Sequence, residues 1–110
     1  MIIIVTPAGK RDIYSLMNKK ELSLRKKKQG TLHRIGKKKR SEDQWAHNKY
    51  SGRIKFQKGV GGVVVAQVNA RDPEDEWQLL SSFIGFLDRN FRDSVSNINI
   101  IYEKDIALFE

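Results

Sequence analysis

Residues 53–68, RIKFQKGVGGVVVAQV, hold two strand patterns separated by a glycine-rich turn. In the first pattern, apolar Ile54 and Phe56 alternate with charged or polar side chains, which is typical of a strand with one buried face. Three glycines then stand within four residues and favour a reversal of the chain. The next six residues are apolar on both faces except at Gln67, so they predict a central strand paired with the first in a hairpin.

The segment after this hairpin carries the most specific helix signals. Asp72 can cap a helix, Pro73 suits its first position, and three carboxylates follow where they meet the positive end of the helix dipole. Apolar residues then recur every three or four positions and predict a helix to about Phe91. They cover about half of its circumference, more than the ~100° that packing on one sheet needs. The residues of this extra width, our candidates for a homodimer face, are Leu79, Phe83 and Phe86.

The rest of the chain predicts a strand at each end and one more helix. Residues 2–6 are β-branched and predict a buried strand, and residues 97–103 alternate and predict the last strand. Between Asp12, a candidate helix cap, and Lys20, apolar residues fall at helical spacing, and we favour a helix there. Residues 21–25 alternate as a strand would, so a second strand remains the alternative.

The order of these elements predicts the fold. Strand, helix, strand, strand, helix, strand is the ferredoxin-like (βαββαβ) order, an α+β class with one antiparallel sheet and helices on one face. The alternative is a strand-rich variant in which residues 11–35 join the sheet. We expect one domain over residues 1–110, with a strand-strand-helix-strand scaffold at 52–103. Residues 25–50 are expected to form a basic loop or arm, because their few apolar residues cannot offset the entropy of ordering them.

Positive charge is concentrated in the first half of the chain. Residues 1–58 contain 17 Lys and Arg against 4 Asp and Glu, whereas residues 59–110 contain 4 against 9. The formal net charge of +8 therefore divides into +13 and −5. Such a polarity predicts a polyanionic partner for one surface. Attraction between the two halves, within the fold or across a dimer, is the alternative.

Two lysine-rich clusters make the basic segment the candidate nucleic-acid-binding surface. Cations that neutralise phosphates release condensed counterions, which supplies sequence-independent affinity. Lysine is a point charge and reads no base pattern, so we expect phosphate positioning rather than sequence recognition. Two cations of the first hairpin strand would extend the charge onto the sheet. The candidate binding residues are Arg25, Lys26, Lys27, Lys28, Arg34, Lys37, Lys38, Lys39, Arg40, Lys49, Arg53 and Lys55.

Aromatic and histidine side chains lie near this charge. Trp45 and Tyr50 flank His47 and are candidates for stacking on a base, but the preferred interpretation is that they anchor the loop to the core. His33 and His47 are candidates for the acid and base of a ribonuclease. No carboxylate is placed to orient either histidine, so two surface histidines are the preferred interpretation.

The first functional hypothesis is a non-enzymatic module that binds RNA or DNA and uses no cofactor or metal ion. The alternatives are a small dimeric accessory protein whose basic loop meets an acidic protein surface, and a small endoribonuclease toxin. The chain has no cysteine, which excludes disulfides and thiolate sites. No apolar run approaches the ~20 residues of a membrane span. We therefore expect a soluble, cytoplasmic protein without a membrane partner.

Overall fold

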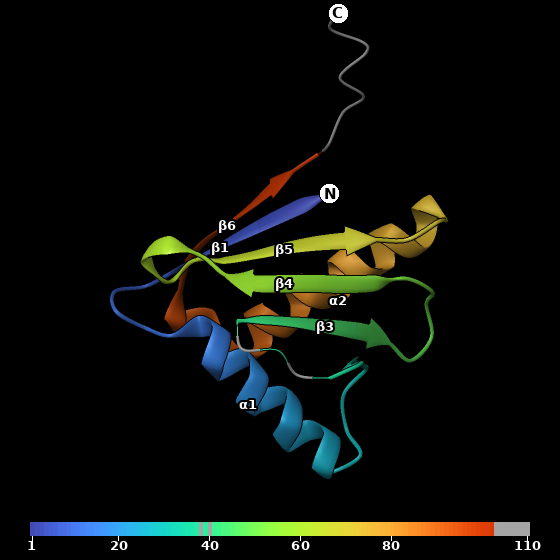
Figure 1. Ribbon diagram of the computed structural model, residues 1–110, viewed down its shortest axis with the longest axis horizontal. Helices are drawn as coiled ribbons and strands as arrows, with labels where there is room; N and C mark the ends of the chain where they lie inside the picture. Colours follow the sequence, from blue (N-terminus) through green and yellow to red (C-terminus); the bar gives the residue numbers. More distant parts are fainter. Residues whose placement is uncertain (38, 40, 103–110) are drawn as a thin grey trace, which may run out of the picture.

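The strands form one antiparallel sheet in the order β2-β3-β4-β5-β1-β6, and two helices pack on it (Figure 1). This computed structural model describes residues 1–37, 39 and 41–102. The predicted α+β class and antiparallel sheet are confirmed. In chain order the elements are β1 (Ile2–Pro7), α1 (Ile13–Lys26), β2 (Leu32–Arg34), β3 (Glu42–His47), β4 (Arg53–Lys58), β5 (Val64–Asn69), α2 (Pro73–Phe91) and β6 (Val95–Ile101).

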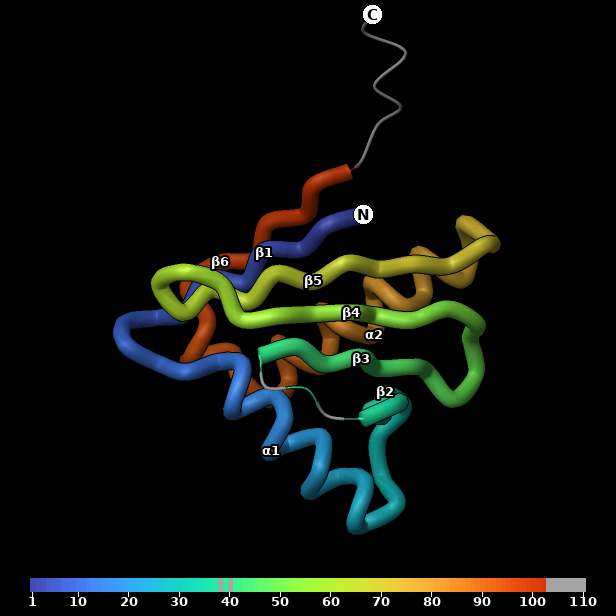
Figure 2. The backbone as a smooth tube through the Cα atoms, in the orientation of Figure 1, coloured from blue at the N-terminus to red at the C-terminus, as the bar shows by residue number. Residues whose placement is uncertain are grey.

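Both helices lie on the same face of the sheet. The ring of Phe56 on β4 contacts both of them, with its centroid 5.7 Å from that of Tyr14 on α1 and 6.3 Å from that of Phe83 on α2. Because side chains alternate along a strand, the residues that share a face with Phe56 supply the core. The residues between them point to the opposite face of the sheet, which neither helix covers (Figure 2).

The predicted ferredoxin-like order is not confirmed, because the described sheet has more strands in a different arrangement. β1 lies between β5 and β6 and is antiparallel to both, so Ile3 stands between Ala66 and Ile100. Residues 25–50, predicted as a loop or arm, instead contribute the end of α1, β2 and β3. The strand-rich alternative also differs from the structure, since α1 occupies much of residues 11–35 and only β2 joins the sheet.

One tryptophan explains why so polar a segment forms strands. Trp45 on β3 is 0% exposed, and its ring lies edge-on to Phe56 at 4.9 Å and to Phe86 at 5.0 Å. Leu32 on β2 is also buried. A buried aromatic side chain removes roughly 150–250 Å² of surface from water. This burial offsets the conformational entropy that orders the segment.

The turn and capping predictions are confirmed. β4 and β5 pair as a hairpin through the glycines of residues 59–62. Asp72 caps α2 by accepting a backbone N–H of the first turn, and Asp12 caps α1 in the same way. α1 continues past its predicted end at Lys20 to Lys26.

The predicted homodimer face is corrected. Leu79, Phe83 and Phe86 are 0%, 0% and 5% exposed, because they pack against the sheet and close the core. The apolar side chains of α2 that remain at the surface lie along β6. They include Trp77, which is 55% exposed. β6 also begins two residues earlier than predicted, and residue 103 lies outside the described residues.

Candidate functional site

Four consecutive cations mark the end of α1. Arg25 and Lys26 occupy the last helical turn, where the helix dipole favours positive charge, and Lys27 and Lys28 follow. All four side chains are exposed. The chain reverses at Lys28, whose φ of 55° lies in the left-handed region, and returns to β2. This turn lies at one end of the molecule (Figure 2), so these exposed cations are grouped there.

A second group of cations lies beside β3. Lys37, Lys39 and Arg53 line a hollow of about 220 Å³. Gln44 also lines it and accepts a hydrogen bond from Nη1 of Arg53 at 3.2 Å. Arg53 and Gln44 both project from the uncovered face of the sheet, since they alternate with buried residues of β4 and β3.

The uncovered face itself combines cations with amides. In the strand register Lys55 stands between Gln44 and Gln67, and its Nζ lies 3.2 Å from Oε1 of Glu42. Amide groups donate to and accept from phosphates and base edges. The further exposed amides on this face are Gln57, Asn69, Asn97 and Asn99.

Most of the candidate cations have no acidic partner within the described residues. Two of them have such a partner: Lys55 pairs with Glu42, and Arg25 lies 3.1 Å from Glu21. No described cation pairs with the acidic first turn of α2, so the two oppositely charged halves do not neutralise each other there. Lys38 and Arg40 lie outside the described residues. The candidate cations without an ion pair in the described ranges are Lys26, Lys27, Lys28, Arg34, Lys37, Lys39, Lys49 and Arg53.

The two candidate stacking residues differ in accessibility. Trp45 is fully buried, which confirms the preferred prediction of a core anchor and excludes the stacking role. Tyr50 is half-buried, and its ring lies 4.8 Å from that of His47, with Nζ of Lys49 at 5.6 Å. Tyr50 is thus the accessible aromatic ring beside a cation in this part of the chain.

The histidines occupy neighbouring register positions on opposite faces of the sheet. His33 stands opposite Ala46, whereas His47 stands opposite Leu32. Burial, followed by the positive charges of His33 and Lys49, lowers the pKa of His47. Its Nδ1 accepts the backbone N–H of Lys49 at 2.9 Å. Side chains on opposite faces are poorly placed to act as acid and base on one phosphate, so this geometry does not favour the ribonuclease hypothesis.

A polar cleft of about 580 Å³ separates α1 from β2 and β3. Its helix wall includes Tyr14, Asn18 and Glu21, which are spaced by four and three residues and therefore share one side of α1. Arg34 and Asp43 line the strand wall. This cleft was not predicted from the sequence. Polar residues at positions that the helical period assigns to the buried side of α1 are the signal that indicates it. The remaining lining residues are Ser15, Lys19, Leu22, Arg25, Ser41 and Lys58.

The buried polar groups on the helix side of this cleft have partners on the same helix. Oε2 of Glu21 lies 3.1 Å from Nε of Arg25. Burial, followed by the negative charge of Asp43, raises the pKa of Tyr14, and a hydrogen bond with the Asn18 side chain acts in the opposite direction. Pairing of this kind avoids the cost of about 1–3 kcal/mol that an unpaired buried polar group carries.

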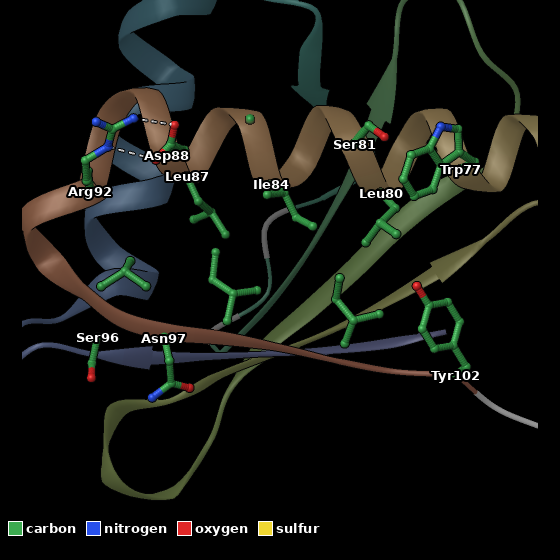
Figure 3. Close-up of a pocket in the computed structure, with 14 residues that line it drawn as sticks. Trp77, Leu80, Ser81, Ile84, Leu87, Asp88, Arg92, Ser96, Asn97 and Tyr102 are labelled. Carbon is green, nitrogen blue, oxygen red and sulfur yellow. Dashed lines mark hydrogen bonds and ion pairs between the residues drawn. The ribbon is translucent and has the colours of Figure 1, made fainter.

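A groove of about 710 Å³ runs between α2 and β6 at the sheet edge (Figure 3). Trp77 and Tyr102 stand at one end and are 55% and 60% exposed, while Ile84 contributes to the apolar wall. Arg92 binds Asp88 through two hydrogen bonds of 2.9 and 2.8 Å. The charged side chains of this groove therefore neutralise each other.

Comparison of the chain with protein-family models, with curated proteins and with solved structures gives no match. Its function is therefore inferred from its own surface. Neither of the two described helices has the length and apolarity to cross a membrane. Within residues 1–37, 39 and 41–102, no three His, Asp or Glu side chains are grouped so that they could hold a metal ion.

Proposed function

We propose that the protein is a non-enzymatic module that binds RNA or DNA through contacts between its cations and nucleic-acid phosphates. The supporting observation is that eight candidate cations have no acidic partner within the described residues, and seven of these eight are exposed. They lie on the turn after α1, beside β3 and on the uncovered face of β4. Because phosphate contacts carry no base information, binding should depend little on sequence.

Salt dependence tests this proposal. Each phosphate contact releases counterions, so the logarithm of the association constant falls linearly with the logarithm of salt concentration. If about six cations contact phosphates, the slope should be about −4 to −5. Fluorescence anisotropy of a labelled single-stranded RNA and of a labelled DNA duplex, across a series of KCl concentrations, measures it. Absence of binding by the wild-type protein at low salt would overturn the proposal.

A charge variant locates the contacts. The triple variant Lys26→Gln/Lys27→Gln/Lys28→Gln removes the exposed cations after α1 and should make the salt slope shallower by up to about three. These side chains are exposed, so their loss should leave the fold intact.

A control of equal charge change separates this effect from net charge. Lys10→Gln/Arg71→Gln/Arg89→Gln also removes three exposed cations, but from surfaces outside the candidate set. It should bind with a slope close to that of the wild type. Equal losses in both triple variants would show that net charge, and not this surface, determines the affinity.

The edge strand β6 favours a second candidate function, a homodimeric interaction protein. Within the part of the chain that the structure describes, β6 pairs only with β1, and its seven residues include no charged residue and no proline. The free N–H and C=O groups of an edge strand pair readily with another strand, and edge strands are usually protected by charge, proline, bulges or short length. Among residues 1–37, 39 and 41–102, β6 is protected by a register shift at its start, and β2 at the opposite edge is protected by its length of three residues.

The charge distribution favours a second copy as the partner of β6. A net charge of +8 makes copies repel each other wherever their cations approach. The β6 edge carries the self-neutralised pair of Asp88 and Arg92, and the candidate cations lie toward the β2 edge. Antiparallel pairing of two β6 strands would cover Trp77 and Tyr102 and keep the basic surfaces apart.

Light scattering across a concentration series tests the dimer. The variant Asn99→Lys places a cation on the edge strand β6. In an antiparallel pair of β6 strands the two new lysines, one from each copy, would lie close together and repel, so the variant should shift the protein toward monomer. Gln67→Lys adds the same charge to the same face on β5 and should leave the dimer intact. A wild-type protein that stays monomeric at high concentration contradicts this candidate.

A further inference from the structure

We propose that the bound nucleic acid is single-stranded and lies on the uncovered face of the sheet, with its phosphates along β4 and its bases over an apolar patch centred on β1. This inference rests on the proposed nucleic-acid binding, and it adds the class of nucleic acid and the surface that receives the bases. Neither described helix covers this face, so a strand of nucleic acid can reach it (Figure 2).

The apolar patch consists of partly exposed aliphatic side chains on neighbouring strands. Ile2 and Ile4 alternate with the buried Ile3 along β1, so both point to the uncovered face. In the strand register Ile4 stands opposite Val65 on β5, and Ile2 stands opposite Ile101 on β6. Ile2, Ile4 and Val65 are half-buried, and Ile101 is 45% exposed. Cross-strand neighbours lie close enough to touch, so these side chains form one continuous apolar surface that a ligand can cover.

Across the sheet, the chemistry of this face changes in the order of a nucleotide. Lys55 on β4 stands beside Gln67 on β5, and Gln67 stands beside Ile2 on β1. A line from β4 to β1 thus passes from a cation through an amide to an apolar side chain, over two strand spacings or ~10 Å. A nucleotide presents a phosphate, a polar sugar and a base with apolar faces in the same order. The ammonium of Lys55 also pairs with Glu42, and its three N–H donors allow both contacts.

Hollows along β4 give this face room for a strand of nucleic acid. A hollow of about 240 Å³ is lined by Ile2, Lys55 and Gln67. A second, of about 760 Å³, shares Gln67 and adds the cations Arg53 and Arg71. Arg53 also lines the hollow of the cations beside β3. Because these hollows share residues, cations recur from one to the next, and a phosphate backbone can follow them.

The apolar patch distinguishes a single strand from a duplex. In a duplex the bases are paired and stacked and the phosphates lie outside, so the patch would face charge. The bases of a single strand are free to turn toward the protein and cover apolar side chains. In the described ranges β1, β4, β5 and β6 place no aromatic ring on this face. Contact with the patch is therefore weaker than stacking on a ring and discriminates little between bases.

The same substitution on opposite faces of the sheet tests the patch. Ile4→Thr removes apolar surface from the uncovered face, whereas Ile98→Thr changes a half-buried residue of β6 that lines the groove with α2. Ile4→Thr should weaken binding of labelled oligouridine three-fold or more and keep the salt slope, because no cation is lost. Binding of an abasic strand of equal length, which keeps the phosphates and has no bases, should change less than two-fold. Ile98→Thr should leave the binding of both strands within two-fold.

A gain of affinity provides a test that a loss of stability cannot imitate. Ile101→Tyr adds an aromatic ring at an exposed position of the patch, and tyrosine suits a strand. Stacking of one base on this ring should strengthen binding of oligouridine about five-fold or more. Binding of the abasic strand and of a matched RNA duplex should change less than two-fold.

Methyl resonances of the wild-type protein provide an independent readout. Titration with oligouridine should shift the δ1 methyl signals of Ile4 and Ile101, and the abasic strand should shift them much less. The site is overturned, and the phosphate contacts stand, if oligouridine binding is unchanged in Ile4→Thr, falls equally in Ile98→Thr, or gains nothing in Ile101→Tyr. Absence of binding of oligouridine, abasic strand and duplex to the wild type at low salt overturns the proposed function itself.

Discussion

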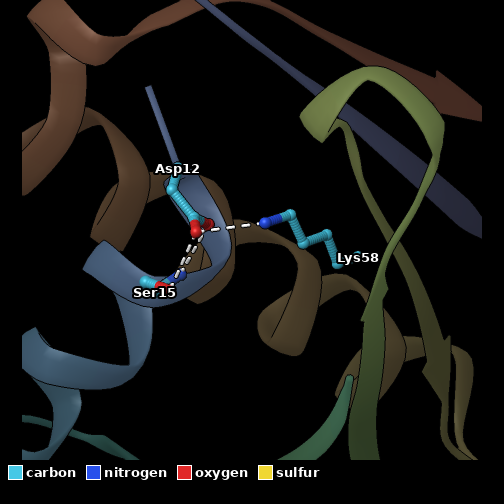
Figure 4. Close-up of polar contacts among 3 residues, drawn as sticks. All are labelled: Asp12, Ser15 and Lys58. Carbon is cyan, nitrogen blue, oxygen red and sulfur yellow. Dashed lines mark hydrogen bonds and ion pairs between the residues drawn. The ribbon is translucent and has the colours of Figure 1, made fainter. Parts of the chain in front are cut away.

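Nζ of Lys58 lies 3.1 Å from Oδ2 of Asp12, so the last residue of β4 is tied to the residue that caps α1 (Figure 4). The same carboxylate accepts the backbone N–H of Ser15 at 3.1 Å and its hydroxyl at 3.0 Å. One side chain thus fixes the start of the helix and its position against the sheet. Because Lys58 and α1 both line the polar cleft, this contact also fixes one side of that cleft.

Removal of this carboxylate should destabilise the protein more than removal of the ammonium. Asp12→Ala loses the helix cap and should lower the free energy of unfolding by about 0.5–2 kcal/mol. Lys58→Met loses one ion pair between half-exposed groups and should cost about 0–1 kcal/mol. Urea unfolding of both variants measures the difference. A larger loss in Lys58→Met would mean that the ion pair, and not the cap, holds the helix.

The cap also predicts a pH dependence in acid. The hydrogen bond from the Ser15 N–H is the main cause that lowers the pKa of Asp12 below its usual value of 3.8. Burial acts in the opposite direction, and Lys58 lowers the pKa to a smaller extent. The contribution of Asp12 is therefore present above the unfolded pKa and is lost as the pH falls through the lowered folded pKa. The stability difference between the wild type and Asp12→Ala should shrink in acid. A difference that persists at the lowest pH where both remain folded contradicts the assignment.

His47 predicts a loss of stability at mildly acidic pH. Its pKa is lowered in the folded state, chiefly by burial, so the unfolded chain binds its proton first. The stabilisation is complete above the unfolded pKa of about 6.5 and falls as the pH drops toward the lowered folded value. His47→Gln should flatten the dependence of the thermal midpoint over this window, as calorimetry can measure. The same slope in variant and wild type would exclude His47 as its source.

Two glycines with left-handed backbone angles should respond differently to alanine. A Cβ on Gly52, at φ +103°, would lie 2.9 Å from Cβ of Ala70 and 2.9 Å from Cδ1 of Leu79 and would strike the carbonyl of Asn69. Gly61, at φ +76°, has nothing within 4 Å of such a Cβ. Gly52→Ala should cost about 2–5 kcal/mol, from strain and overpacking together, and Gly61→Ala about 1 kcal/mol, from strain alone. Denaturant unfolding that ranks them the other way would contradict the packing around Gly52.

The two tryptophans should report different environments. Trp45 is 0% exposed and Trp77 is 55% exposed. In Trp77→Phe the remaining Trp45 should emit at short wavelength and resist acrylamide quenching, whereas in Trp45→Phe the remaining Trp77 should emit at longer wavelength and be quenched readily. Ready quenching of Trp45 would restore it as a candidate stacking residue. Slow quenching of Trp77 at high protein concentration, relieved by Asn99→Lys, would support the β6 dimer.

Local signals made one half of the fold predictable. The β4–β5 hairpin follows from period-two alternation and glycines, and the start of α2 follows from Asp72 and Pro73, all within short windows. β2 and β3 were missed because Trp45 gains its burial from Phe56 and Phe86, which lie far along the chain. Composition alone cannot reveal such partners, so the lysine-rich composition of this segment predicts a loop where the structure has two strands.

The candidate site was predictable only in part for a similar reason. Exposed lysines must stay at the surface, so their availability followed from the sequence, but their grouping beside β3 depends on strand pairing. The cleft needs α1 to face β2 and β3, and those strands were not expected. Tyr14, Asn18 and Glu21 could have been noted as polar residues on the buried side of a helix, without any indication that Arg34 and Asp43 face them.

The position of β1 has a consequence for biosynthesis. β1 leaves the ribosome before its two partners, β5 and β6, which emerge only after α1 and the strands β2 to β4. β2 to β5 pair in sequential order and can assemble earlier. During this time the apolar residues 2–5 of β1 have no strand partner and are prone to association with other chains. Insertion of β1 between strands remote in sequence raises the contact order and slows folding. Ile2 stands opposite Ile101. In a circular permutant that carries β1 after β6, these two strands would therefore be neighbours in sequence and could pair as a hairpin.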